Sequence, residues 1–542
     1  MVFLNTNHVI MSDIQILDGC IDKFKNQNFN NNNYILIADK QNVDTAIRLS
    51  LLSKIIQKKN NANMLVLTDK KKHLSLKIYE MFNIKKIYIS FQIKDFFSNI
   101  FFSIYCSLIY FTLMIKFAVD KNLIRNFIDD FKFYNIHVGD LMYDTYIRND
   151  HSFLNFNIFN LKFLKIFFIT LFRLKKIKSL FDLHKIKVVV SSSLSFNFGS
   201  TLAIRYASKI GCKTYVHADT LFKEIKSYDM CQDSVFKVYK EELLIFKKNE
   251  DKMNVDNFIN KRFFKNSYSG NFVQIDTFKK AYFNSKNINR FDFIQNLTKN
   301  TSARINDENL LNLIALNCFS DAPRSFSKSG IFLFQDYYDF FVKSIEAISK
   351  LDKKNIWLIK PHPANLKYGE GGIIEELLEK YNLENVFMCP KNINNKNYFN
   401  IIDNLITSRS TIALEYACFG GKPIICGSTP YNGLGFTHEP QSINEYYNIL
   451  KNLNFNNKLN DEEKNNARAT LYILDHVKVE HLEKSIILPS RNDFENIDRR
   501  LFNDEYFKKI KITLNERKIH SFFDDPYYKS LELLVNNLRV TS

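Results

Sequence analysis

Glycine and proline are scarce in this sequence, which holds 14 Gly and 9 Pro in 542 residues. That scarcity excludes a collagen-like or low-complexity chain. With 46% hydrophobic and 15% aromatic residues, the chain can instead bury two substantial cores, and global disorder is excluded. A length of 542 residues predicts several domains rather than one.

Patterns that bind metals are also missing. The 8 cysteines show no CxxC or Cys/His ligand spacing, and several fall in apolar segments, which predicts reduced core thiols in a cytosolic protein. We find no acidic pair suited to a Mg²⁺–diphosphate site, since Asp524-Asp525 lies near the C-terminus, directly before Pro526. We therefore expect no metal and no other cofactor. The N-terminus lacks a basic region followed by an apolar core, so we expect no signal peptide and a cytoplasmic location.

The charge is strongly positive, with 75 Lys+Arg against 57 Asp+Glu and a formal net charge of +18. Nucleic-acid binding is disfavoured because the sequence contains no recognition module. Two interpretations stay open. One is attraction to a polyanionic glycan or peripheral contact with the anionic inner-membrane surface. The other is a compositional bias with a solvated lysine face.

The amino-terminal half begins with alternating strands and helices. Strands are predicted over 34–38, 64–68 and 86–90, with helices over 43–57 and 73–82 between them, which indicates a doubly wound domain. A further β-branched strand over 187–190 leads into a serine-rich turn and a helix over 201–210. Ser192 and Ser193 in this turn, with Arg205 on the helix, are our candidates for binding an acceptor hydroxyl or a phosphate.

Two apolar segments of this half could meet a membrane. Residues 96–115 are uncharged and very apolar, near the ~20 residues that a membrane span needs, but Ser, Asn and Thr dilute them and favour a buried or interface helix. Residues 154–181 mix phenylalanines with lysines and arginine. That pattern fits a helix lying in a membrane interface and equally a packed surface helix.

The second domain begins near residue 309, and two of its predicted strands end in polar groups. The strand over 356–359 stops at Lys360-Pro361-His362-Pro363, because neither proline can donate a ladder hydrogen bond. A strand at 405–406 is followed by the hydroxyl-rich turn 408–411, a helix over 411–419 and a strand over 423–426. Ligands bind beyond the carboxyl ends of the strands in such sheets, so these two junctions predict one site.

The helix start suits a phosphate, because it offers free backbone N–H groups, hydroxyls and a guanidinium. Glu415, one turn into the helix, could accept hydrogen bonds from ribose hydroxyls. Ser320 and Asp321 follow the strand predicted over 310–316, and Asp321 could instead cap the turn there. The predicted nucleotide-binding residues are Lys360, His362, Ser408, Arg409, Ser410, Thr411, Glu415, Ser320 and Asp321.

The motifs LIKPHP, SRSTIALEYACFGGKPII and YNGLGFT, preceded by NCFSDAPRSF and LFQDYYDFF, resemble the donor half of bacterial surface-carbohydrate glycosyltransferases of the GT-B fold. Capsule polysaccharide biosynthesis proteins, including capsular Kdo transferases, are the most similar group. Bacterial polysialyltransferases and teichoic-acid glycerophosphotransferases share the His-Pro pair more loosely. The resemblance covers the C-terminal third well and the N-terminal half thinly.

That resemblance implies a metal-independent glycosyltransferase of capsule or lipopolysaccharide biosynthesis. Its donor would be a nucleotide sugar, with a CMP-activated acidic sugar such as Kdo as the best guess, and its acceptor a glycan or glycolipid. The alternatives are a CDP-polyol phosphotransferase of teichoic-acid type and a non-catalytic glycan-binding or assembly protein. A nucleotide-sugar 2-epimerase is disfavoured, because a small soluble substrate does not need the long, basic, aromatic amino-terminal half.

The resemblance also implies an α/β fold of two Rossmann-like doubly wound domains facing across a cleft, with helical insertions. We predict an acceptor domain over 1–220, a helical connector over 221–308, a donor domain over 309–455 and, by analogy, a helical tail over 456–542 that packs back on the first domain.

An inverting enzyme needs a general base in the acceptor domain. Asp140 and Asp144, four residues apart, are the first candidates, with His217 second and His362 as a catalytic hydrogen-bond donor. In the alternative reading Asp140 caps a helix and Asp144 pairs with Arg148.

Overall fold

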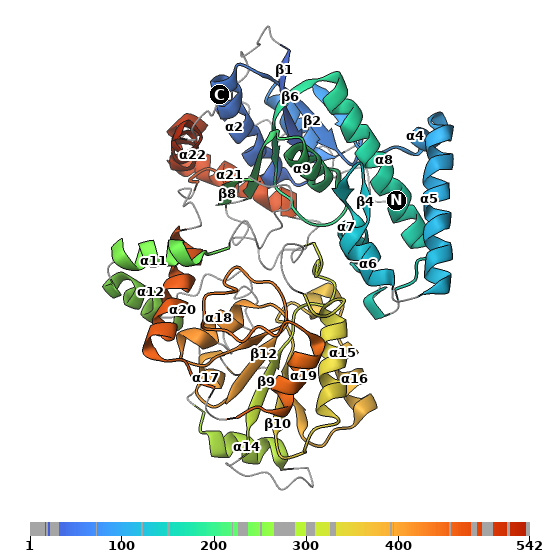
Figure 1. Cartoon of the computed structure of the whole chain (residues 1–542). Coiled ribbons are helices and arrows are strands. Elements are labelled where there is room, and N and C mark those ends of the chain that lie inside the picture. Colours follow the sequence, from blue (N-terminus) through green and yellow to red (C-terminus); the bar gives the residue numbers. More distant parts are fainter. Residues whose placement is uncertain are drawn as a thin grey trace. The chain divides into compact units, whose positions relative to one another are not determined.

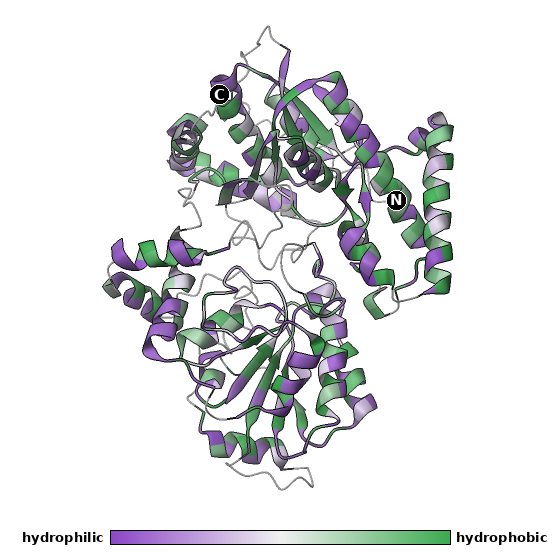
Figure 2. Ribbon diagram, in the orientation of Figure 1, coloured by the Kyte–Doolittle hydropathy of each residue, from purple (hydrophilic) through white to green (hydrophobic). Residues whose placement is uncertain are grey.

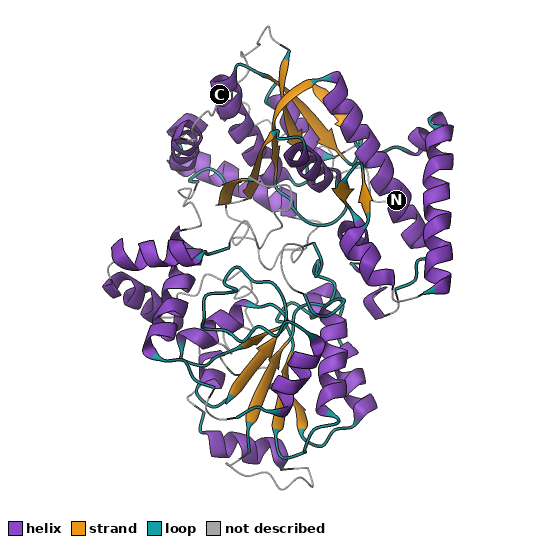
Figure 3. Ribbon diagram, in the orientation of Figure 1, coloured by secondary structure: helices purple, strands orange, loops and turns teal. Residues whose placement is uncertain are grey.

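The computed structural model describes residues 17, 20–21, 32–71, 73–120, 123–148, 152–154, 156–218, 221–225, 237–249, 252–264, 288–299, 309–325, 332–390, 393, 395–454, 457–477, 485–489, 502–517 and 521–537. The chain divides into two compact units. Unit 1 comprises Met1–Thr145, Asn157–Met230 and Val479–Ser542, and unit 2 comprises Tyr146–Phe156 and Cys231–Lys478. Their helices and strands are shown in Figures 1 and 3.

Unit 1 is built on a six-stranded sheet with the strand order β3-β2-β1-β6-β7-β8. All neighbours pair in parallel except β7 and β8, which pair antiparallel. The strands are β1 (Asn33–Ala38), β2 (Asn63–Thr68), β3 (Lys86–Ile89), β6 (Lys185–Ser191), β7 (Lys213–Ala218) and β8 (Leu221–Glu224). The order reverses between β1 and β6, as in a doubly wound fold.

The helices of unit 1 come from all three of its chain segments. They are α2 (Val43–Asn60), α3 (Leu74–Met81), α4 (Ile93–Ser98), α5 (Ile100–Val119), α6 (Leu123–Asp130), α7 (Gly139–Ile147, reaching the unit boundary), α8 (Leu161–Leu183), α9 (Gly199–Lys209), α21 (Phe502–Arg517) and α22 (Pro526–Asn537). A two-stranded ribbon, β4 (Lys132–Phe133) with β5 (Ile136–His137), precedes α7.

The C-terminal helices complete the core of unit 1. Tyr506 of α21 and Tyr527 of α22 are buried in the same hydrophobic cluster as α2, β1 and β2. The Tyr506 hydroxyl donates to Asp44 on α2 at 2.8 Å, and the Tyr527 hydroxyl is hydrogen-bonded to His217 at the end of β7. His217 is fully buried, so its side chain supports this packing.

Helices α5 and α8 contain the two apolar segments, and they differ in burial. α5 covers most of residues 96–115, for which we expect a buried or interface helix, and only 22% of its most apolar window is buried. It is the one helix in the described parts of the chain that is long and apolar enough to cross a membrane, judged by length and composition alone. α8 instead buries Phe163, Phe167 and Leu171 completely, so its phenylalanines belong to the core and the packed-helix interpretation holds.

Unit 2 is built on a five-stranded, wholly parallel sheet with the order β11-β10-β9-β12-β13. The strands are β9 (Leu311–Ala315), β10 (Ile356–Lys360), β11 (Val386–Met388), β12 (Asn404–Thr407) and β13 (Ile424–Ile425). All five residues of β9 are buried, as expected for a central strand whose two faces are both covered by helices. The α/β class with two Rossmann-like, doubly wound domains is thus confirmed.

The helices of unit 2 surround this sheet. They are α11 (Lys240–Asn249), α12 (Lys252–Phe264), α14 (Arg290–Thr298), α15 (Tyr337–Ile348), α16 (Ile373–Tyr381), α17 (Asn395–Phe399), α18 (Thr411–Cys418), α19 (Ile443–Lys451) and α20 (Asp461–Tyr472), which continues as a π-helical turn (Ile473–Val477). The connector predicted over 221–308 therefore lies mainly in unit 2. The tail predicted over 456–542 is divided between the units at Lys478.

Candidate functional site

A cavity of about 360 Å³ lies in unit 2, where the chain leaves the carboxyl ends of β9, β10 and β12. We call it the strand-end cavity. Its lining comes from six regions: the turn after β9, the start of α15, the loop after β10, the start of α18, the segment around Tyr431 and the segment around Asp475. The lining residues are Asn317, Cys318, Asp321, Tyr337, His362, Arg409, Ser410, Thr411, Leu414, Thr429, Pro430, Tyr431, Leu471, Leu474 and Asp475.

Five predicted nucleotide-binding residues meet in this cavity: Asp321, His362, Arg409, Ser410 and Thr411. The two strand-end junctions singled out in the sequence therefore do face one space. The other four predicted residues, Ser320, Lys360, Ser408 and Glu415, are absent from its lining.

His362 is held in one tautomer by its own loop. Its Nδ1 accepts a hydrogen bond from the backbone N–H of Ala364 at 3.2 Å, and Cys318 Sγ lies 3.1 Å from the same nitrogen. Since Nδ1 serves as an acceptor, Nε2 carries the ring proton. Burial lowers the pKa of His362 to about 4, although the nearby Asp321 carboxylate opposes that shift. The site thus contains a neutral imidazole with one N–H to donate.

The start of α18 is fixed by hydrogen bonds to its neighbours. Ser410 is the N-cap of the helix, and its hydroxyl accepts from Ile412 N. The carbonyl of Ser410 accepts from the Tyr431 hydroxyl at 2.6 Å. Ser408 is fully buried, and its hydroxyl donates to Asn317 Oδ1 at 2.8 Å. Ser408 thus supports the turn that presents Arg409, Ser410 and Thr411 to the cavity.

Asn317 ties two strand ends together. Its amide nitrogen donates to the Arg409 carbonyl at 2.6 Å, while its amide oxygen accepts from Ser408. Gly427, which follows β13, lets its own backbone pack closely against Ser408 and Phe332. A Cβ there would lie 2.8 Å from the Ser408 carbonyl oxygen and 2.7 Å from the Phe332 ring. The turn at 408–411 is therefore held rigidly between β9 and the chain after β13.

Asp321 belongs to a cluster with Arg148 and Tyr368. Arg148 Nη1 lies 3.0 Å from Asp321 Oδ1, and the Tyr368 hydroxyl donates to the same oxygen at 2.9 Å. The Arg148 guanidinium stacks over the Tyr368 ring, 4.3 Å from its centroid, a cation–π contact. Arg148 lies in the short segment Tyr146–Phe156 that belongs to unit 2, so a residue from early in the chain holds Asp321, which lines the cavity.

Ser320 is hydrogen-bonded to a buried carboxylate. Glu370 is 1% exposed and accepts from the backbone N–H groups of Phe319 and Ser320, both at 2.9 Å, and from the Ser320 hydroxyl at 2.7 Å. Ser320 therefore fixes the turn after β9 rather than offering its hydroxyl to the cavity. Sequence reasoning missed Glu370 and Tyr368, and it considered Arg148 only as a partner for Asp144. The Gly-rich GEGG stretch around Glu370 is a local signal for a turn.

Glu415 has a different place from the one we expect. Its side chain is 1% exposed and paired with the buried Arg262 of α12 at 3.0 Å, and it also accepts from Asn395 Nδ2 at 3.3 Å. Arg262 is bonded in addition to Asp475, which does line the cavity. In this structure the carboxylate that lines that side of the cavity is thus that of Asp475. Arg262 binds Asp475, and Glu415 in turn binds Arg262.

Lys360 lies at the end of β10 and is not among the lining residues. Its ammonium is 4.9 Å from the centroid of the Tyr398 ring. Burial lowers the pKa of Lys360, while Cys389 and Glu415 act in the opposite direction. The cation is therefore enclosed between α17 and the sheet.

The predicted general base Asp140 is engaged in an ion pair in unit 1. Its two carboxylate oxygens receive Arg205 Nη1 at 2.8 Å and Nη2 at 2.7 Å, and Arg205 also donates to the His137 carbonyl at 2.8 Å. Asp140 is 2% exposed and Asp144 is fully buried. Asp140 and Arg205 are thus paired with each other in this structure. The sequence-based hypothesis gives them separate roles, Asp140 as the general base and Arg205 as an acceptor-binding residue.

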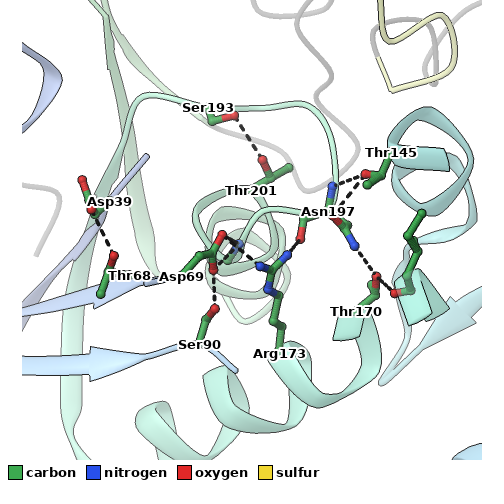
Figure 4. A network of polar contacts seen from close by, with 12 residues as sticks. Asp39, Thr68, Asp69, Ser90, Thr145, Thr170, Arg173, Ser193, Asn197 and Thr201 are labelled. Atoms are coloured by element: carbon green, nitrogen blue, oxygen red, sulfur yellow. Dashed lines mark hydrogen bonds and ion pairs between the residues drawn. The ribbon is translucent and has the colours of Figure 1, made fainter. Parts of the chain in front are cut away.

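The carboxyl edge of the unit 1 sheet carries a second polar network (Figure 4). Asp69, after β2, accepts from Gly199 N at 3.2 Å and pairs with Arg173 at 3.2 Å. A Cβ on Gly199 would lie 2.6 Å from the Asp69 carboxylate, so only glycine fits at this start of α9. Asp69 thus caps a helix from across the sheet, whereas the usual expectation is that it caps the helix following its own strand.

The predicted acceptor-binding serines lie in the same region. Ser193 is 4% exposed, and its hydroxyl accepts from Thr201 at 3.3 Å and contacts the Ser195 carbonyl. Within the described residues, Ser192 Oγ is buried without a hydrogen-bond partner. The structure thus places Ser192 and Ser193 in one turn, as expected, while Arg205 is committed to Asp140.

The tautomer and pKa of His362 lead to a first prediction. The folded state holds this pKa at about 4, below the ordinary 6.5. On acidification the unfolded chain therefore takes up the proton first, so the unfolding free energy falls as the pH drops from 6.5 to about 4. We expect ¹⁵N NMR of histidine-labelled protein to show a neutral, Nε2-protonated ring at pH 5, assigned by its disappearance in His362→Gln. An imidazolium signal at pH 5 would contradict this.

No protein-family model and no curated protein matches the chain. Among solved structures it is similar to the beta Kdo 2,4 transferase of Thermosulfurimonas dismutans KpsC, at 11% identity and a TM-score of 0.31, over 53% of this chain and 79% of that one. The beta Kdo 2,7 transferase of the same KpsC is similar at 10% identity and a TM-score of 0.28, over 55% and 80%.

A third similar structure is the UDP-GlcNAc 2-epimerase of Neisseria meningitidis, bound to UDP-GlcNAc. It has 10% identity and a TM-score of 0.18, over 89% of this chain and 99% of that one. At such identities and scores these likenesses assign neither activity nor substrate. The fold class rests on the topology of the two sheets.

Proposed function

We propose that the protein is a glycosyltransferase that uses a nucleotide sugar, and that the strand-end cavity binds the phosphate of the donor. The observation that carries the proposal is the meeting of His362, Arg409 and the start of α18 in one cavity beyond three parallel strands. Ligands of open α/β sheets bind at this edge. A guanidinium and a helix N-terminus are the groups that receive phosphate there.

Each lining group has a definite part in this proposal. Arg409 and the N–H groups at the start of α18 neutralise the phosphate that leaves with the nucleotide, and the Ser410 and Thr411 hydroxyls donate to it. His362 donates its Nε2 proton as a hydrogen bond, without carrying a charge. Such fixed donors stabilise the negative charge that develops on the leaving phosphate. With these groups in place the transfer needs no metal, and we propose that it uses none.

The donor is proposed from the motif resemblance and not from the cavity. We propose a CMP-activated acidic sugar, of the Kdo or nonulosonate class, transferred to a glycan or glycolipid of the bacterial surface. A CDP-polyol phosphotransferase and a non-catalytic glycan-binding protein are the competing functions. The first would prefer CDP to CMP, and the second would bind no nucleotide.

Unfolding monitored by tryptophan fluorescence tests this proposal. The only tryptophan is Trp357, fully buried in β10, so the signal follows unit 2. We expect CMP at 100 times its Kd to raise the Tm by roughly 5 °C, since ligand linkage then contributes about 2.7 kcal/mol. EDTA should leave this shift unchanged, and CDP, UDP and GDP should give smaller shifts. A larger shift with UDP would overturn the donor class, and the absence of any shift would overturn the proposal.

A further inference from the structure

An uninterrupted apolar stripe runs along α5. Phe101, Ile104, Leu108, Phe111, Ile115 and Val119 are 86%, 53%, 60%, 60%, 52% and 84% exposed. Their spacing of three or four residues places them on one side of the helix. Figure 2 shows α5 mostly in the hydrophobic colours along its length. Monomeric soluble proteins rarely expose contiguous apolar patches beyond a few hundred Å², so we infer that this stripe is covered by something.

The opposite side of α5 is attached to unit 1 along the whole helix. Near its start, the Phe102 ring lies 4.9 Å from Phe172 of α8. In the middle, the Tyr110 ring lies 5.1 Å from Phe167 of α8, and near the end the Phe117 ring lies 6.1 Å from Phe127 of α6. A helix held at these places cannot cross a bilayer unless it detaches from its unit. Whatever covers the stripe must therefore lie alongside the helix.

The charges around α5 favour an anionic partner. Asp95 and Asp120 flank the segment, and no acidic residue occurs between them. Exposed lysines lie on α4 (Lys94), near the end of α5 (Lys116) and on the neighbouring α8 (Lys165), and the whole chain carries a formal net charge of +18. α5 is a surface helix about 30 Å long, with an apolar outer side and lysines nearby. Helices of this composition lie in the headgroup region of anionic membranes.

We propose that α5 docks unit 1 on an anionic lipid bilayer, lying in the membrane plane with its stripe among the upper acyl chains and its lysines near lipid phosphates. This inference does not depend on the proposed transferase activity.

Flotation of the full-length protein with vesicles tests the docking. The vesicles contain phosphatidylcholine alone or mixed with phosphatidylglycerol. We expect the wild type to float with the mixed vesicles, less so at high salt, and the Phe101→Glu/Leu108→Glu double variant to lose flotation. The matched control, Ile512→Glu/Leu533→Glu, changes two exposed residues of unit 1 (44% and 63%) on other helices, and it should float like the wild type.

Two outcomes would overturn the proposal. In one, the wild type does not float, or the stripe variant floats as well as the control. In the other, sedimentation shows a wild-type dimer that the stripe variant dissociates, which would mean that a second copy covers the stripe.

The depth of insertion can be measured separately. Leu108→Trp places a new fluorophore on the stripe near the middle of α5, while Trp357 stays fully buried in unit 2. Lipids brominated near the headgroup should quench the added signal more than lipids brominated at the chain end. The reverse order would mean that the helix spans the membrane, and would overturn the in-plane arrangement.

Discussion

His362→Ala is expected to weaken nucleotide binding about 10- to 100-fold, because a hydrogen bond to a charged group contributes about 1.5–3 kcal/mol. In the proposed complex the neutral ring donates from Nε2, while Nδ1 is occupied by Ala364 N–H and Cys318. In the proposed complex, removal of the ring leaves a phosphate oxygen without a donor. Calorimetric titration with CMP measures the change.

Two conservative variants separate the roles of the two ring nitrogens. The Gln amide nitrogen reaches roughly the place of Nε2, and the Asn side chain reaches roughly that of Nδ1. If His362 acts on the ligand, His362→Gln retains more affinity than His362→Asn. If the residue only shapes its loop, the order is reversed and the proposed role is wrong. His438→Ala is the control, because His438 lines a separate cavity of unit 2.

Asp140→Asn is expected to destabilise unit 1 by about 3–5 kcal/mol, the usual effect of breaking a buried ion pair. The substitution leaves Arg205, 11% exposed at its side chain, without its bidentate partner. Chemical denaturation followed by circular dichroism should show an earlier transition. The Trp357 signal, which belongs to unit 2, should keep its midpoint.

The sequence-based hypothesis predicts a different effect of this variant. If Asp140 is the general base, its replacement by Asn spares nucleotide binding and abolishes turnover. Asp140→Leu combined with Arg205→Met should recover much of the stability, because apolar replacement of a whole buried pair is often neutral. The control is Asp182→Asn, which breaks the exposed pair with Lys178 (59% and 44% exposed) and should change stability by less than about 1 kcal/mol.

The elements around the strand-end cavity could be predicted closely from the sequence. The helix predicted over 411–419 differs from α18 by one residue, and so does the strand predicted over 356–359 from β10. Local signals suffice there, since Pro361 and Pro363 end a strand and Ser410 caps a helix regardless of the rest of the chain. His362, Arg409, Ser410 and Thr411 meet because parallel strands end at one edge of the sheet.

The ion-pair partners of the candidate site residues could not be predicted from the sequence. Glu415 is paired with Arg262, 153 positions away in the chain, and Asp140 with Arg205, 65 positions away. No local pattern encodes such pairs, because they depend on how distant segments pack. Arg148 was considered only as a partner for Asp144, and its ion pair with Asp321 could not be foreseen for the same reason.

What the apolar faces of the two helices contact could not be predicted, for a different reason. Uniform hydrophobicity over 96–115 indicates an apolar environment but does not tell protein interior from lipid. The lysines between the phenylalanines of 154–181 indicate two faces, without telling which partner the apolar face meets. In the structure, α8 turns its phenylalanines to the core and α5 keeps only a narrow side against it.

The division of the chain affects the order in which the two units can fold during synthesis. Unit 2 has all of its segments once residue 478 has left the ribosome, whereas unit 1 needs the last 64 residues, Val479–Ser542. Until then α2 lacks the aromatic side chains of Tyr506 and Tyr527 against its buried face. Domains usually fold from the amino terminus onward, but in this chain all segments of the later unit are made first, and the earlier unit lacks part of its core until α21 and α22 have been made.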